Sequence, residues 1–416
     1  MRPATVQNVL IHLALAVGTA LAIAAPGPIA DAAGSSSGDA PGALAQTVRP
    51  PHLLVANGAR PVWSPLRRRP RFAFDSIVDE NNRNMAVFVM DGAGEQRVCM
   101  TCTATIPRGF VGMMDWLPDG KHLLVTAENE RSLHRRFNHP SFGVDNDLWL
   151  VSVDGKRTER IWRTSTKGGA VLNARVNRTG TQLLFAERLP TTKPLPQALR
   201  RFGPGGEDAW AGWRLHVADI DLRRQGEAVL RNHRTLQPNG AGFYEPSGFA
   251  PDGALVYAFT PEGQRYCDDV WSFAQGKRSG AQTGTERTQP RNLTNSTATW
   301  EEHGQYTADL RWFGFVSSAF NPQLRFPGAD NAQLVTELYL QRGTDVAQRL
   351  TSFNAPAAPA VAHSNASPSA GGGVHLAGGR VVSRFAFSPD SRRVLMQVSP
   401  SDRTAPPQLW LQELPR

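Results

Sequence analysis

Short apolar runs alternate with turn residues along most of the chain, and the same unit returns six times. Each unit has a turn, an apolar strand, an insert of variable length and a second apolar strand, which in most units carries Trp or Tyr. The apolar runs that follow the turns are 71–74, 122–126, 182–185, 254–259, 310–316 and 393–398. A unit that recurs over nearly the whole chain predicts a repeat architecture.

The six turns begin with an aromatic or apolar residue that is followed by turn-forming residues. They are Trp63-Ser-Pro-Leu-Arg67, Trp116-Leu-Pro-Asp-Gly120, Val176-Asn-Arg-Thr-Gly180, Phe249-Ala-Pro-Asp-Gly253, Tyr306-Thr-Ala-Asp-Leu310 and Phe387-Ser-Pro-Asp-Ser391. Pro presets φ, Asp accepts hydrogen bonds from its own turn, and Gly tolerates positive φ. Each turn therefore predicts a hairpin.

A third strand follows each insert, and in four units a polar turn leads to a fourth, outer strand. The third strands are expected at 85–90, 147–153, 213–220, 269–273, 337–341 and 408–414, and the outer strands at 96–100, 159–162, 228–231 and 348–352. Four strands and tight turns need only about 40 to 45 residues, and each unit here is longer. The excess residues are expected in loops, which is where binding residues concentrate.

The sixth unit ends with its third strand, and residues 52–56 lie before the first turn with no other assignment. We expect these residues to supply the missing outer strand, because a ring closed by both chain ends hides an exposed sheet edge. The sequence thus predicts an all-β fold, a six-bladed β-propeller of four-stranded antiparallel blades over residues 51–416. Unrelated hairpins in a β-sandwich are the alternative.

The N-terminal residues have the pattern of a targeting segment. Arg2 precedes an uncharged apolar stretch at 9–25, and small residues alternate at 30–32 and 43–45. We expect a signal peptide at 1–32, cleaved after Ala32 or Ala45, and a flexible leader at 33–50. An uncleaved anchor is the alternative, since the stretch is near the short limit for a membrane span. The mature protein is expected to be exported, periplasmic or extracellular, without a membrane span, and monomeric.

Net charge and composition restrict the class of partner that the protein is expected to bind. Lys and Arg number 45 against 36 Asp and Glu, a net charge of +9. In an exported protein this excess favours an acidic protein or an acidic envelope polymer over nucleic acid, although a generally basic, solvated surface is the alternative. Residues 354–379 are rich in Ala, Pro, Ser and Gly, so a disordered loop is expected there.

The long connections between second and third strands, at 128–146, 188–212 and 317–336, are expected to open on one face around the central channel. Arg bonds carboxylates or phosphates in bidentate fashion, and Trp offers a flat anchor. These connections therefore predict a basic, aromatic rim for an acidic ligand or peptide, with solvated insertions as the alternative. The candidate ligand-binding residues are His134, Arg135, Arg136, His139, Arg200, Arg201, Trp210 and Arg325.

The start of the fifth unit reads Trp300-Glu-Glu-His303. Two carboxylates and an imidazole can bind a divalent metal or act as an acid–base pair. Because adjacent strand residues point to opposite faces, we expect Glu301 and His303 to share a side and Glu302 to lie on the other. A further ligand would have to come from another loop, such as His134 or His139. No other cofactor is expected.

The chain has three cysteines, too few for a disulfide scaffold. Cys99 and Cys102 are expected to form a local disulfide in an oxidising compartment, provided that a turn brings them within reach. A zinc site would need a second ligand pair nearby, and the sequence shows none. Cys267 is expected to be a buried free thiol.

The turn Phe387-Ser-Pro-Asp-Ser391, together with Asn146-Asp-Leu-Trp149, Asp268-Asp-Val-Trp271 and Thr336-Glu-Leu-Tyr339, resembles the WD-like (PD40-type) repeats of the TolB-like propeller family. In that family FSPDG opens the second strand, and DIW or DLY opens the third. The resemblance covers about residues 58–416 and implies a stand-alone propeller without the N-terminal domain of TolB. The turns at Trp63, Val176 and Tyr306 depart from the family pattern.

No nucleophile–base pair or full ligand set can be assembled from these motifs. We therefore expect a non-enzymatic binding module that docks a protein, a peptide or an envelope polymer on its loop face. The alternative is a propeller enzyme of the lyase or lactonase type, with a metal site at the channel mouth. Ligands drawn from separate blades would leave no local motif in the sequence.

Overall fold

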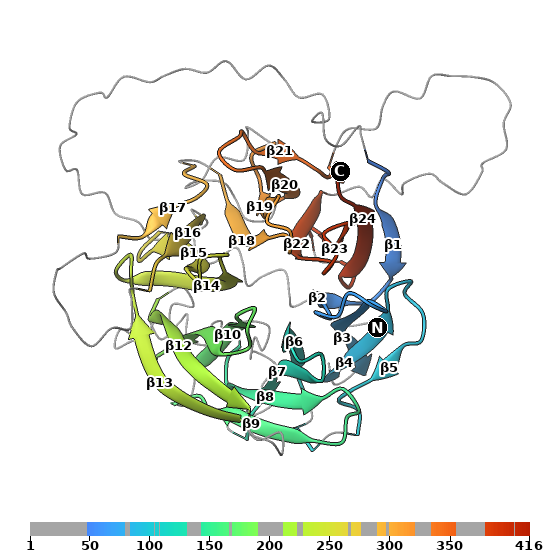
Figure 1. The fold of residues 1–416 in the computed structure, drawn as a ribbon, viewed down its shortest axis with the longest axis vertical. Helices are drawn as coiled ribbons and strands as arrows, with labels where there is room; N and C mark the ends of the chain where they lie inside the picture. The colour runs from blue at the N-terminus through green and yellow to red at the C-terminus, as the bar shows by residue number, and fades with distance from the viewer. Residues whose placement is uncertain are drawn as a thin grey trace, which may run out of the picture.

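Six four-stranded antiparallel sheets surround one central axis in the computed structural model of the protein (Figure 1). The structure describes residues 48–79, 84–103, 105–107, 109–130, 143–165, 169–189, 211–222, 228–264, 268–275, 289–296, 299–320, 334–354, 379–402 and 404–416. The predicted six-bladed, all-β propeller is confirmed.

The blades share one order of strands from the axis outward. The innermost strands are β2 (Ala59–Trp63), β6 (Val111–Trp116), β10 (Ala170–Val176), β14 (Gly242–Phe249), β18 (Glu301–Tyr306) and β22 (Arg380–Phe387). The second strands are β3 (Arg71–Asp79), β7 (His122–Glu128), β11 (Gln182–Arg188), β15 (Leu255–Pro261), β19 (Phe313–Ser317) and β23 (Arg393–Pro400). The third strands are β4 (Asn84–Asp91), β8 (Asn146–Ser152), β12 (Trp213–Leu222), β16 (Asp269–Phe273), β20 (Glu337–Gln341) and β24 (Gln408–Glu413). The outer strands are β5 (Val98–Cys99), β9 (Thr158–Trp162), β13 (Ala228–Leu236), β17 (Arg291–Asn292), β21 (Gln348–Arg349) and β1 (His52–Val55).

Ring closure is as the sequence predicted. The strand β1 pairs antiparallel with β24, with His52 opposite Leu411, so both ends of the described chain share the sixth blade. Strand β17 of the fourth blade pairs with β16 through Trp271 and Ser272. The prediction missed it because the long connection 274–290 separates the two strands, whereas a short turn precedes each of the four predicted outer strands.

An acidic residue that opens the third strand fastens three of the blades. Asp147, Asp269 and Glu337 each accept a hydrogen bond from a backbone N–H beyond the outer strand of the same blade. The donors are Thr164 at 3.0 Å, Ser296 at 3.1 Å and Asn354 at 2.7 Å. These bonds satisfy backbone groups where the chain leaves one blade for the next, which gives the Asp-x-aromatic motif a structural role.

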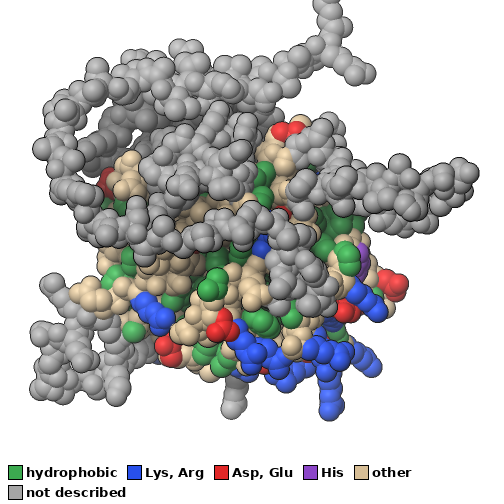
Figure 2. Space-filling view, turned by 90° about the horizontal axis from the view of Figure 1, so that it is seen from above, with side chains coloured by type: hydrophobic (Ala, Val, Ile, Leu, Met, Phe, Trp, Pro, Cys, Tyr) green, Lys and Arg blue, Asp and Glu red, His purple; other side chains and the backbone are tan. Residues whose placement is uncertain are grey.

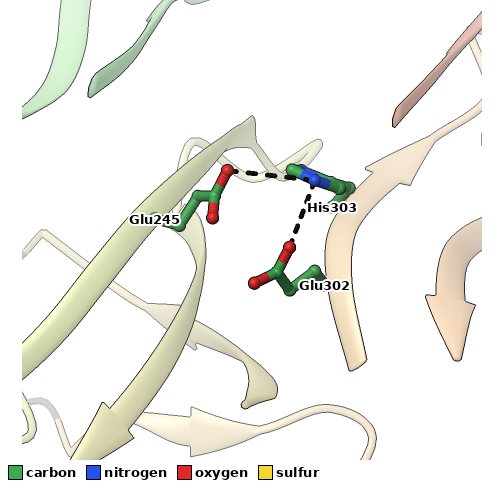
Figure 3. A group of neighbouring side chains, drawn as sticks. All are labelled: Glu245, Glu302 and His303. Atoms are coloured by element: carbon green, nitrogen blue, oxygen red, sulfur yellow. Dashed lines mark ion pairs between the residues drawn. The ribbon is translucent and has the colours of Figure 1, made fainter. Parts of the chain in front are cut away.

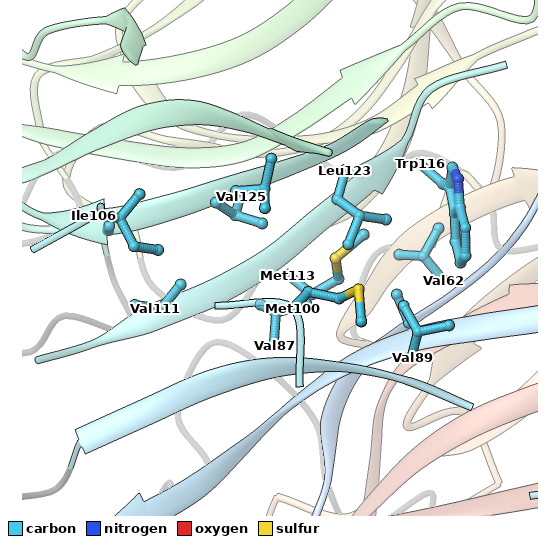
Figure 4. Packing of buried hydrophobic residues seen from close by; sticks show 13 residues of the cluster. Val62, Val87, Val89, Met100, Ile106, Val111, Met113, Trp116, Leu123 and Val125 are labelled. Carbon is cyan, nitrogen blue, oxygen red and sulfur yellow. The ribbon is translucent and has the colours of Figure 1, made fainter. Parts of the chain in front are cut away.

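Apolar side chains fill the space between neighbouring blades. Figure 4 shows the cluster between the first two blades, where Val62 and Val89 meet Met113 and Leu123. Met113 and Leu123 are wholly buried, and burying such a side chain stabilises the fold by about 1.5–3 kcal/mol. Equivalent clusters lie around the ring, so the blades pack against one another without helices.

Every innermost strand contains a β-bulge. The register shifts lie between Ala59/Val62, Met113/Asp115, Leu172/Arg175, Pro246/Gly248, Glu302/Gln305 and Val382/Arg384. In alternate blades the first unpaired residue has positive φ, namely Arg60 (48°), Asn173 (46°) and His303 (60°). Bulges redirect side chains, and here they change which residues face the axis.

Further expectations concern the cysteines, a membrane-spanning helix, the N-terminal segment and the loop at 354–379. Cys99 and Cys102 are bonded, with Cα atoms 5.7 Å apart, as expected. The described part of the chain contains no helix of the length and hydrophobicity that a membrane crossing needs. The signal peptide, most of the 33–50 leader, Cys267 and nearly all of the 354–379 loop lie outside the described residues.

Candidate functional site

Three buried side chains with metal-ligating atoms meet beside the central axis. Glu245 comes from β14, and Glu302 and His303 come from β18 of the next blade (Figure 3). His303 Nε2 lies 3.3 Å from Glu302 Oε2 and 3.8 Å from Glu245 Oε1. One ligand atom from each residue lies within 4.8 Å of the others, and each residue is at most 7% exposed. We call these three residues the axial triad.

The bulge in β18 builds the triad. His303 has a φ of 60° and stands in the register shift between Glu302 and Gln305. Strict alternation is lost there, so the imidazole pairs with Glu302, its immediate neighbour. The expectation that Glu302 lies apart from His303 is therefore wrong. Glu301 instead accepts hydrogen bonds from Thr299 Oγ1 at 3.2 Å and Ser317 Oγ at 3.1 Å.

Side chains from two further blades reach the triad through Glu245. Asn173 Nδ2 on β10 donates a hydrogen bond to Glu245 Oε1 over 2.5 Å. Arg384 Nη2 on β22 lies 3.3 Å from the same oxygen. Four consecutive blades thus contribute side chains to one buried polar cluster, which a propeller can assemble only around its axis.

Asp268, in the segment before β16, extends the cluster. It is wholly buried, and neither of its carboxylate oxygens accepts a hydrogen bond of ordinary geometry among the described residues. Its carboxyl interacts directly with that of Glu302. Hydrogen-bonding interactions with Glu302 and Trp300 only partly oppose the effect of burial on the pKa of Asp268. A buried carboxylate is costly unless a proton or a cation neutralises it.

Burial shifts the titration of the whole cluster. It raises the pKa of Asp268 to about 7, and it raises the pKa of Glu302 well above its usual range, with the charges of Glu245 and Asp268 adding to the effect. Burial also raises the pKa of Glu245, against the opposing influence of Arg384 and the hydrogen bond from Asn173. The pKa of His303 is lowered well below its usual range, again by burial, so the imidazole is neutral and can ligate a metal.

The count of charges shows what the cluster lacks. Glu245, Glu302 and Asp268 supply three carboxylates, and Arg384 is the one cation in contact with them among the described residues. Burial lowers the pKa of Arg384 to about 10, so it stays protonated at neutral pH. The guanidinium of Arg175 also acts on Glu245, from a greater distance. When all three carboxyls are ionised, the cluster still has more negative than positive charge, and protons or a divalent cation can balance it.

The distances also fit a common ion. Two ligand atoms that are each about 2.1 Å from a zinc ion are at most about 4.2 Å apart. The separations of His303 Nε2 from Glu302 and Glu245, 3.3 Å and 3.8 Å, fall inside that limit. Carboxylate oxygen with imidazole nitrogen suits zinc, and carboxylate oxygen suits manganese. The residues present can therefore hold a divalent cation.

Several predicted site residues cannot be placed in this arrangement. The eight rim residues, from His134 to Arg325, lie outside the described residues, as do His134 and His139 as further ligands. Of the predicted metal pair, His303 belongs to the triad, and Glu301 is replaced by Glu302 and by Glu245 from the neighbouring blade.

Glu245 and Arg384 were missed because further ligands were expected from the long loops and not from the innermost strands of other blades. A signal was present, since polar residues lie three or four positions before the residue that opens each turn in five units. They are Arg60, Asn173, Glu245, His303 and Arg384. Aligning the six units by their turns would have brought these residues together at one level of the channel.

Comparison with known proteins finds similar solved structures but no matching family. No protein-family model matches the chain, and no curated protein matches it either. The structure is similar to prolyl oligopeptidase B from Galerina marginata, with a TM-score of 0.43 and 12% identity over 82% of this chain, which spans 38% of that protein. It is also similar to a TolB from Agrobacterium tumefaciens, with a TM-score of 0.40, 13% identity, and 77% and 95% of the two chains covered. For a gluconolactonase from Xanthomonas campestris the values are 0.44, 15%, and 90% and 98%.

Proposed function

We propose that the protein is a binding propeller whose axial triad holds a divalent cation. The observation that carries the proposal is the excess of buried carboxylates. The three carboxyls of Glu245, Glu302 and Asp268 outnumber the two guanidiniums, of Arg384 and Arg175, that act on the cluster. The imidazole nitrogen of His303 lies within coordination range of Glu245 and Glu302. A divalent cation would neutralise the excess of negative charge.

The position of the triad along the central axis indicates the face from which a ligand would approach. The innermost strands begin on the face from which the long second-to-third connections leave, and the triad lies in the first half of β18. A cation held there would lie in the half of the channel on which these connections open. We propose that an acidic group of a peptide or envelope polymer binds it, in an exported protein. The disulfide between Cys99 and Cys102 supports an oxidising compartment.

Cation binding to protein stripped with a chelator tests the proposal. Equilibrium dialysis against Zn²⁺ and Mn²⁺, followed by elemental analysis, should give one bound ion per chain. Glu302→Gln and Glu245→Gln should each weaken binding at least about tenfold, a loss of about 1.4 kcal/mol. Each substitution keeps the size of the side chain and removes the charged ligand.

Glu301→Gln is the matched control. Glu301 and Glu302 are adjacent and equally buried, both 5% exposed, but the carboxylate of Glu301 bonds Ser317 and Thr299 outside the triad. This control should bind the cation as the parent does. Absence of stoichiometric binding, or equal losses in Glu301→Gln and Glu302→Gln, would overturn the proposal.

An enzyme of the lyase or lactonase type would use the same cation. The two functions separate once the cation is bound. Turnover of a lactone or a uronic acid polymer that requires the cation, and that Glu302→Gln abolishes, would favour the enzyme. Saturable capture of an acidic ligand without turnover would favour the binding propeller.

A further inference from the structure

A groove lies where the ring closes, on the face opposite the start of the innermost strands. It has a volume of about 1170 Å³. On one side it is lined by β1 and the end of β24 in the sixth blade, and on the other by the β2–β3 and β4–β5 turns of the first blade. We call it the closure groove. It shares no residue with the axial triad.

Its charge is strongly positive. Five arginines line it against two acidic residues, and Asp91 accepts hydrogen bonds from N–H groups of its own turn, at Ala93 and Glu95. The five arginines are Arg49, Arg68, Arg69, Arg71 and Arg393. In an edge-on view of the protein, Lys and Arg side chains gather along one border (Figure 2).

Two of the five arginines pack against aromatic rings, and the other three are exposed. The guanidinium groups of Arg71 and Arg393 lie over the rings of Trp116 and Trp63, at 5.4 Å and 5.0 Å from the ring centroids. Arg49, Arg68 and Arg69 are exposed and form no ion pair among the described residues. Three free guanidinium groups on one groove are suited to carboxylates.

The sequence departs from its own repeat at this groove. In four other blades the turn between the first two strands carries an Asp that accepts a hydrogen bond from an N–H of that turn. The four residues are Asp119, Asp252, Asp309 and Asp390. The first blade has Leu66 and the run Arg67–Arg69 instead, and Arg69 adopts a φ of 56°. The other four turns thus carry a hydrogen-bonded Asp, whereas the turn of the first blade carries three arginines.

The closure groove also offers apolar contact. Leu66 is 44% exposed, and Leu54, Leu411, Pro50 and Pro70 lie along the same lining. A carbohydrate polyanion would satisfy the arginines and leave the leucines in water. A peptide that combines acidic and apolar side chains satisfies both, because it removes apolar surface from water while it pairs the charges.

We infer that the closure groove binds an acidic peptide segment of a partner protein, with a leucine-sized side chain seated against Leu66 and Leu54. Carboxylates of the peptide would pair with Arg49, Arg68 and Arg69. The partner would approach from the face opposite the axial cation, so both sites could be filled at once.

Fluorescence anisotropy with a labelled peptide of alternating Glu and Leu tests this inference. The double variant Arg49→Glu/Arg68→Glu should weaken binding at least about tenfold. The control Arg178→Glu/Arg342→Glu makes the same change of charge at exposed arginines in turns of other blades, and it should alter affinity less than about twofold. Equal losses in the two double variants would show attraction to net charge alone and would overturn the site.

A second comparison separates the peptide from a polyanion. Leu66→Ser should weaken binding of the Glu–Leu peptide several-fold, with only a small loss of folded stability, because the side chain is already 44% exposed. Polygalacturonate, which has no apolar side chains, should bind more weakly than the peptide at equal ionic strength. Tighter binding of polygalacturonate, or no effect of Leu66→Ser on the peptide, would contradict the inference.

Discussion

The central channel contains two buried charged groups that differ in how completely they are satisfied. Arg60 donates to both carboxylate oxygens of Asp75, each at 2.7 Å, and the backbone N–H of Met113 donates to Asp75 as well. The cluster of Glu245, Glu302 and Asp268 lies in the same channel, where Arg384 contacts its carboxylates and Arg175 acts from a greater distance. The charges of Arg60 and Asp75 are fully paired, whereas the carboxylate cluster has more negative than positive charge.

This difference separates a structural from a binding role. A bidentate pair that also receives a backbone hydrogen bond has no remaining need for a ligand. Buried carboxylates that are not paired with positive charge must take up protons, or they bind a cation instead. Burial and polarity alone do not mark a site, whereas an unbalanced charge count does.

The largest loss of folding stability should come from breaking the ion pair between Arg60 and Asp75. Asp75→Ala leaves the guanidinium of Arg60 without its partner, and Arg60 is 11% exposed at its side chain. Breaking such a buried pair costs about 3–5 kcal/mol. Urea unfolding followed by tryptophan fluorescence measures this loss. The double variant Arg60→Met/Asp75→Leu should recover most of the stability, and a double variant as unstable as Asp75→Ala would show that the pair is not the cause.

A smaller effect should appear in the pH dependence of the cation-free protein. The pKa of Asp268 is raised to about 7 in the folded state and is near 3.8 when the chain is unfolded. The folded protein therefore binds a proton that the unfolded chain has lost, so stability decreases as pH rises from about 4 to about 7.

Asp268→Asn should flatten this decrease. One group contributes about 1.4 kcal/mol per pH unit inside that window, and unfolding curves at pH 5 and pH 7 in the presence of a chelator measure it. The variant and the parent should differ by about 2 kcal/mol in their change between the two pH values. A parallel pH profile in both proteins would show that Asp268 is ionised throughout.

The smallest effect concerns the backbone at the bulge. His303 and Arg60 both have positive φ, which side chains other than Gly and Asn adopt at a cost of about 1 kcal/mol. His303→Gly should therefore be more stable than His303→Ala by about 1 kcal/mol, while both lose the imidazole and the cation. Thermal unfolding compares them, and a more stable Ala variant would mean that the bulge does not persist without His303.

The blades could be predicted from the sequence because their determinants are local. The Pro-Asp-Gly turns and the apolar strands lie next to each other in the chain, and the turns at Trp116, Phe249 and Phe387 mark their hairpins directly. Ring closure by β1 followed from the missing strand of the last unit. Strand β17 could not be predicted in this way, because residues 274–290 separate it from β16 and no short turn marks it.

The axial triad could be predicted only in part because it depends on two non-local features. Alternation predicted the wrong neighbour of His303, since a bulge with positive φ interrupts the strand at that residue. Glu245 and Asp268 come from another blade, and no local motif connects them to the fifth. Only an alignment of the units by their turns places Glu245 level with His303. Charge balance becomes visible only once the blades are assembled.

Anomalous diffraction from crystals soaked in Zn²⁺ tests the central claim most directly. The account predicts one strong peak beside the axis, about 2.0–2.2 Å from His303 Nε2 and from oxygens of Glu245 and Glu302. A channel without a peak at saturating zinc, or a peak at Glu301 with the triad unchanged, would contradict it.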